Sequence, residues 1–150
     1  MKTDEVISVL NNLIQTSRDG ELGFRTCSED ATDPELKTFL LSRTRDCANA
    51  VRELQDLVRA YGKEPPDGSS VSGTLHRRWI GIKAAILGRN DEAILEECER
   101  GEDVAKHHYR VALGEDLPIE IHSVVQRQFN DVLQNHDMVK TLRDRMHAHG

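Results

Sequence analysis

The sequence predicts an all-α protein built as a four-helix bundle, and three observations support this prediction. Long segments without proline are rich in Leu, Glu, Arg, Lys and Ala, which favour helices. In these segments apolar residues recur at spacings of three and four, as on one face of an amphipathic helix. No segment shows the apolar–polar alternation that marks a half-buried strand. The prolines between the segments mark where helices begin or end, and they are Pro34, Pro65, Pro66 and Pro118.

The first two helices are predicted over residues 3–31 and 33–62. An apolar stripe runs along each of them, and a short turn joins them. Asp33 is the candidate N-cap of the second helix, with Pro34 in its first turn and Gly62 as the C-cap that ends it. These two helices therefore form an antiparallel hairpin.

A second hairpin is predicted after a long connection. Residues 62–90 form a crossover that contains a short helix over 74–87. The third and fourth helices follow over 91–113 and 118–146, and Gly114 ends the third. One long crossover between the second and third helices is the ferritin-like arrangement, whereas an up-down-up-down bundle needs only short loops. The spacing thus predicts a ferritin-like four-helix bundle.

Length and charge limit what the chain can do. Its 150 residues suit one domain over residues 1–150. With 26 acidic and 20 basic residues the net charge is −6, so we expect neither nucleic acid nor an anionic membrane as a partner. No apolar run reaches the roughly 18 residues of a membrane span, and the first residues lack the apolar run of a secretory signal. Three cysteines without a CxxC spacing indicate reduced thiols and a cytoplasmic location.

Four polar residues fall on or beside the apolar stripes, one on each long helix: Glu21, Arg43, Glu102 and Gln128. Glu21 and Arg43 each lie 11 residues from the first turn. Glu102 and Gln128 each lie 13 residues from the second turn. At about 1.5 Å per residue, the members of each pair share a level, which predicts an inward polar layer. Because buried carboxylates need a cation, we expect Arg43 to pair with Glu21, Glu102 or both.

A metal could supply that cation instead. A di-iron bundle takes one Glu from each of two helices and a Glu-x-x-His pair from each of the other two. Neither the second nor the fourth predicted helix contains Glu-x-x-His. His136, which borders the inward face of the fourth helix, is the best remaining candidate ligand. The alternative is therefore one divalent metal, iron or another, held by Glu21, Glu102 and His136, or by Gln128 in place of the histidine.

The three cysteines, Cys27, Cys47 and Cys98, fall on inward stripes, where buried thiols act as small hydrophobes. Cys27 and Cys47 lie at levels about 15 Å apart, which is too far for a disulfide. We expect all three to pack in the core.

A basic and aromatic cluster lies on the predicted crossover helix, at His76, Arg77, Arg78 and Trp79. We expect Trp79 to pack this helix on the bundle while the arginines stay solvated. The alternative is an anion-binding or partner-binding patch that also includes Lys83.

Several segments resemble known ferritin-like proteins. DGELGFRTC at 19–27 and ERGEDVAKHHYRVAL at 99–113 are similar to the first and third helices of rubrerythrin-type proteins. GSSVSGTLHRRWIGIKAAILGRND at 68–91 and HDMVKTLRD at 136–144 resemble a bacterial family of ferritin-like proteins known only as a domain of unknown function. The resemblance covers nearly the whole chain. It implies a ferritin-like bundle and no established activity.

These observations lead to two hypotheses about function. Of the ferritin-like di-iron pattern, only Glu21 and Glu102 carry over by resemblance. The first hypothesis is therefore a non-enzymatic bundle with a degenerate di-iron site and no cofactor, in a stress-related or protein-interaction role, as a dimer or with a protein partner. The second is a metal-binding oxidoreductase or iron-binding protein that uses Glu21 and Glu102. A core site for a small apolar or anionic ligand stays open as a third.

Overall fold

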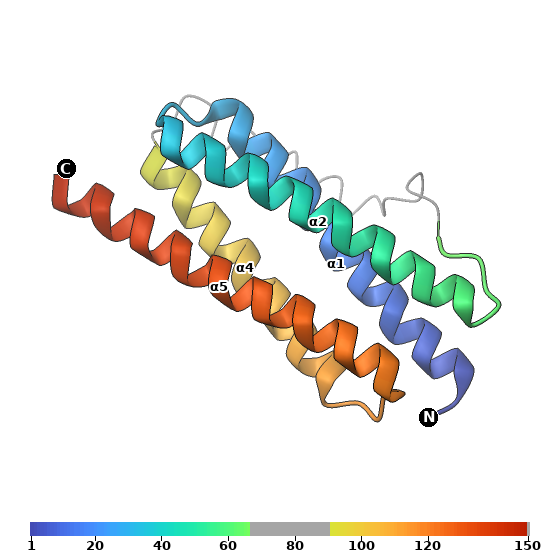
Figure 1. Ribbon diagram of the computed structural model, residues 1–150. Coiled ribbons are helices and arrows are strands. Elements are labelled where there is room, and N and C mark those ends of the chain that lie inside the picture. The colour runs from blue at the N-terminus through green and yellow to red at the C-terminus, as the bar shows by residue number, and fades with distance from the viewer. Residues whose placement is uncertain (67–90, 150) are drawn as a thin grey trace.

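The computed structural model describes residues 1–66 and 91–149, and these form four long helices without a strand. The helices are α1 (Thr3–Asp30), α2 (Pro34–Ala60), α4 (Asp91–Leu113) and α5 (Ile119–His149). Helices α1 and α2 form one antiparallel hairpin, and α4 and α5 form a second one beside it (Figure 1). The hairpins contact each other chiefly through α1 and α4, and to a smaller extent through α2 and α5. The predicted all-α fold is confirmed, while the predicted short helix at 74–87 lies outside the described residues.

Local signals in the sequence set the ends of these helices. Asp33 caps α2 by accepting a hydrogen bond from the Leu36 N–H at 2.9 Å. Gly62 follows α2 with a φ of 79°, in the left-handed region that favours glycine. The carboxylate of Asp91 accepts hydrogen bonds from the backbone N–H groups of Thr32 and Asp33. The first turn is thereby fixed to the beginning of α4.

The apolar core is divided into two clusters along the bundle. One cluster lies toward the chain's N-terminus and includes Leu10, Leu54 and Ile121. The other lies toward the first turn and includes Leu40 and Ile94, among others. Three buried polar residues, Thr16, Ser17 and Glu102, lie on the helix segments between these clusters, and Arg43 and Gln128 lie near the inner ends of the clusters. None of the four described helices combines the length and the apolar character that crossing a bilayer requires.

Candidate functional site

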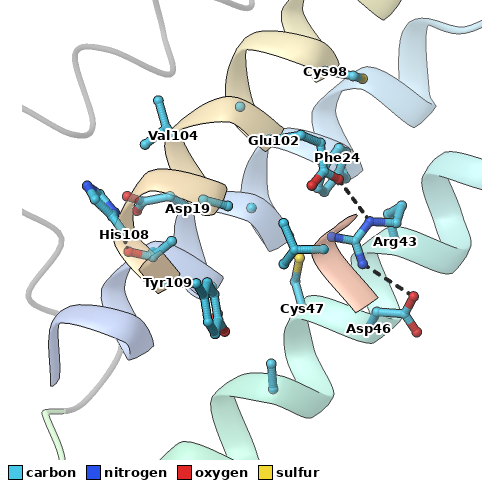
Figure 2. Close-up of a pocket in the computed structure, with 18 of the residues that line it drawn as sticks. Asp19, Phe24, Arg43, Asp46, Cys47, Cys98, Glu102, Val104, His108 and Tyr109 are labelled. Atoms are coloured by element: carbon cyan, nitrogen blue, oxygen red, sulfur yellow. Dashed lines mark hydrogen bonds and ion pairs between the residues drawn. The ribbon is translucent and has the colours of Figure 1, made fainter. Parts of the chain in front are cut away.

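An ion pair between α2 and α4 lies in the middle of the bundle. The Nε atom of Arg43 donates to Oε1 of Glu102 at 3.1 Å, and the two side chains are only 5% and 1% exposed. Asp46, one turn along α2, accepts a second bond from Nη1 of Arg43 at 3.3 Å (Figure 2). The guanidinium also lies 5.1 Å from the ring centroid of Phe24, within cation–π range. Three helices therefore fix the orientation of Arg43.

Glu21 lies elsewhere, which corrects the predicted polar layer. Its carboxylate accepts from Arg25 at 2.9 Å, one turn along α1, and its side chain is 27% exposed. The inward positions of α1 at this level belong to Gly20, Gly23 and Phe24, which border the central cavity. Adding a Cβ at Gly20 would bring it within 2.9 Å of a sulfur on α2, so the two helices approach closely there. Because these residues occupy the inward face of α1, Glu21 lies at the rim of the cavity and not inside it.

Gln128 is buried as predicted, but its partners are different groups. Its Oε1 atom accepts from the Tyr109 hydroxyl at 2.7 Å, and its Nε2 atom donates to Oε1 of Glu53 at 2.7 Å. The Tyr109 oxygen also lies 3.3 Å from Oγ of Ser17. One residue from each helix thus joins a second polar group, separate from the ion pair. Tyr109 falls on the inward stripe of the third predicted helix and is buried, but the sequence did not identify the partner that its buried hydroxyl needs.

His136 contacts α4 at the edge of the site. Its Nε2 atom lies 2.9 Å from Oδ1 of Asp103, and its side chain is 19% exposed. Within residues 1–66 and 91–149, no three or more His, Cys, Asp or Glu side chains are grouped so that they could hold a metal ion. The predicted ligands Glu21, Glu102 and His136 are therefore not brought together. The predicted patch at residues 76–79 lies outside the described residues.

Burial and charge compete at the ion pair. Burial raises the pKa of Glu102 above its usual value, and attraction to Arg43 opposes this shift without cancelling it. Burial alone would lower the pKa of Arg43, but its interactions with Glu102, Cys47 and Asp46 raise it. The second oxygen of Glu102, Oε2, is buried and has no hydrogen-bond partner among the described residues. A buried acceptor without a donor lowers the stability of the fold, and buried polar groups in native proteins are rarely left unpaired.

Glu102 is one of the residues that line a cavity of about 300 Å³. All four helices line it, and the ion pair, Phe24 and Tyr109 form parts of its wall (Figure 2). A groove of about 240 Å³ between α2 and α5 adjoins it, because both are lined by Asp46, Gln128 and Asp131. Among the described residues that line this hollow, Oε2 of Glu102 is the one buried side-chain acceptor without a hydrogen-bond partner.

The three cysteines also line this cavity, and all are free and buried. Burial raises the pKa of the Cys47 thiol to about 12. The pKa of Cys98 is raised well above its usual value, first by a side-chain hydrogen bond with Cys27 and then by burial. At neutral pH both thiols are therefore protonated and chemically unreactive.

This protonation predicts how the thiols respond to alkylation. With its pKa at about 12 rather than 9.0, Cys47 has a thiolate population about a thousandfold smaller at pH 8 than in the unfolded chain. We expect iodoacetamide to label Cys47 and Cys98 at least about a hundredfold more slowly in the native protein than in urea. Mass spectrometry of peptides gives the rate at each site. Equal native and unfolded rates at Cys47 would contradict the structure.

Helix α2 ends at one end of the bundle and α4 begins at the other, as in the ferritin-like arrangement of four helices (Figure 1). The fold is similar to that of a mutant of Dps1 from Mycobacterium smegmatis, with a TM-score of 0.76 at 12% sequence identity. The match covers 94% of this chain and 96% of that chain. At this identity the similarity concerns the fold alone.

The sequence itself identifies the family. Residues 5–115 match the family described as a domain of unknown function (DUF2383), and the chain belongs to this family. No curated protein matches the chain at a significant level. The predicted resemblance to a ferritin-like family of unknown function is confirmed, while the similarity to rubrerythrin stays a prediction.

Proposed function

We propose that the protein is a non-enzymatic ferritin-like bundle that works by binding and has no di-iron centre. The observation that carries this proposal is the buried pair of Arg43 and Glu102 at mid-height in the bundle. In di-iron bundles, carboxylate and histidine ligands from all four helices hold the cation at the core. Here the guanidinium of Arg43 supplies a permanent positive charge beside the carboxylate.

The donor set around the cavity supports the proposal, because it does not fit a di-iron centre. One oxygen of Glu102 is bonded to Arg43, and Glu21 is bonded to Arg25. The hydroxyl of Tyr109, also in the cavity wall, donates a hydrogen bond to Gln128 and is not available as a metal ligand. The metal ions of a di-iron centre would also lie close to the Arg43 guanidinium, and these like charges would repel each other.

A second candidate is a protein that binds one metal ion through Glu102 and His136. The unpartnered Oε2 atom of Glu102 favours it, and the interaction with His136 is one of those that oppose the rise in the pKa of that carboxyl. Glu21 would have to turn away from Arg25 to complete the ligand set. This candidate therefore requires a rearrangement that the first does not.

Elemental analysis of untagged protein from iron-supplemented medium tests the proposal. We expect no iron, manganese or zinc above background in the wild type. In Arg43→His the permanent cation becomes a potential ligand, and we expect metal to be gained. Arg25→His makes the same change at an exposed arginine–carboxylate pair and should gain none. Stoichiometric metal in the wild type that is lost in Glu102→Ala would overturn the proposal and favour the second candidate.

A further inference from the structure

We propose that the central cavity binds a small organic amine whose ammonium group donates a hydrogen bond to Oε2 of Glu102, while its apolar body fills the rest of the hollow. The inference rests on the proposed function, because the same carboxylate oxygen cannot ligate a metal at the same time.

Oε2 of Glu102 is the unpartnered oxygen of this wall, and because it has less than 1 Å² of accessible surface, the ammonium reaches it when the surrounding side chains shift slightly. The side chain of Glu102 is 1% exposed, and Arg43 holds its Oε1 atom. Arg43 is held in turn by Asp46 and by the face of Phe24 (Figure 2). The carboxylate therefore cannot turn to satisfy Oε2 without breaking the ion pair. A ligand that brings an N–H donor would remove the cost of this unsatisfied buried oxygen.

The charge of the lining selects a cation over an anion. Five carboxylate side chains line the cavity, against the two guanidinium groups of Arg43 and Arg100. The adjoining groove between α2 and α5 adds Glu53, whose carboxylate is shared by Gln128 and Arg127. Acidic side chains at a partly enclosed site attract cations and repel anions. The anionic ligand left open by the sequence is therefore disfavoured.

Size and lining select an organic cation over a bare metal ion. A cavity of about 300 Å³ is about twice the roughly 150 Å³ of an engineered apolar cavity that binds benzene. Its wall also contains Phe24, Val104, Val132 and Ala105, which suit an apolar body. A bicyclic aryl-alkyl amine such as tryptamine matches this combination of volume, apolar wall and single anionic acceptor.

The test titrates tryptamine into chelator-treated, metal-free protein by calorimetry and follows the amide resonances by NMR. Two molecules of similar shape serve as controls, the anion indole-3-propionate and the uncharged 3-ethylindole. We expect tryptamine to bind saturably and about tenfold or more tightly than either control, because only it brings a charged donor to Glu102. The perturbed resonances should cluster on the segments of α1, α2 and α4 that line the cavity.

Variants connect the binding to the proposed contacts. Glu102→Gln keeps the shape of the side chain, removes its charge, and should weaken tryptamine binding about tenfold or more. Glu96→Gln is the matched control, because Glu96 is an exposed residue of the same helix outside the cavity wall. Ala105→Leu fills the cavity without touching the ion pair, so it tests the site even where Glu102→Gln fails to fold. It should reduce binding of tryptamine by a similar factor.

Two results would contradict the proposed amine site. One is the absence of saturable tryptamine binding to the metal-free wild type, and the other is binding that neither Glu102→Gln nor Ala105→Leu weakens. Either result leaves the metal analysis of the untreated protein unchanged. Stoichiometric metal in the untreated protein would instead overturn the proposed function, whatever tryptamine does.

Discussion

Replacing Arg43 with methionine is expected to lower the free energy of unfolding by about 3–5 kcal/mol. Methionine keeps an unbranched apolar stem but removes the guanidinium from a carboxylate that is 1% exposed. The buried charge of Glu102 is then uncompensated, and this costs more than the original pair contributes. Urea denaturation at pH 7, followed by circular dichroism, measures the change. Arg25→Met is the matched control, since its exposed pair with Glu21 should contribute less than about 1 kcal/mol.

A double variant separates the loss of the pair from the cost of an unpaired charge. Arg43→Met combined with Glu102→Leu replaces both ions with apolar groups of similar size. We expect the double variant to recover most of the stability that Arg43→Met loses, because no charge is left buried. If the two single losses simply add, the two residues are not energetically coupled, and the central role assigned to their contact is wrong.

The pH dependence of this loss follows from the Glu102 pKa. Because burial raises that pKa, the folded state holds the proton more tightly than the unfolded state. Between the two pKa values the folded state binds more protons, so stability falls as the pH rises through this window. Removing Arg43 removes the attraction that opposes the shift, which raises the pKa further. The stability deficit of Arg43→Met should therefore be smaller at acid pH than at neutral pH.

The fold was accessible from sequence because its determinants are local. Proline and glycine positions, with the cap at Asp33, place the helix ends to within a few residues. The length of the crossover then selects the ferritin-like connection over an up-down-up-down bundle. Burial of Arg43 and Glu102 was also accessible, because each lies on a continuous apolar stripe.

The details of the polar site were less accessible, because they depend on how far each helix is rotated. One residue along a helix turns the side chain by about 100°, so a position beside the stripe can point to the rim, as Glu21 does. The glycines of α1 present no side chain to reveal which face is inward. The bonds from Gln128 to Tyr109 and Glu53 depend on spacing between helices, which no periodicity within one helix records.

Truncating core leucines on either side of the ion pair is expected to have the other large effect on stability. Leu40 and Leu54 are both 0% exposed, and they belong to the two different core clusters. We expect Leu40→Ala and Leu54→Ala each to lower the free energy of unfolding by about 2–5 kcal/mol, through lost burial and the cavities left behind. Leu41→Ala is the control, because Leu41 is 41% exposed on the same helix and should change stability by about 0.5 kcal/mol or less.

The double variant tests whether the polar centre divides the core. Leu40 and Leu54 are 14 residues apart on α2, about 21 Å along the helix, with the ion pair and the cavity at levels between them. Sites this far apart without shared neighbours usually contribute additively, so the double loss should equal the sum within about 0.5 kcal/mol. If the stability lost by the double variant is much smaller or larger than this sum, the two core clusters are energetically coupled. The hollow at Glu102 could then collapse when either end is loosened, rather than persist as a preformed site.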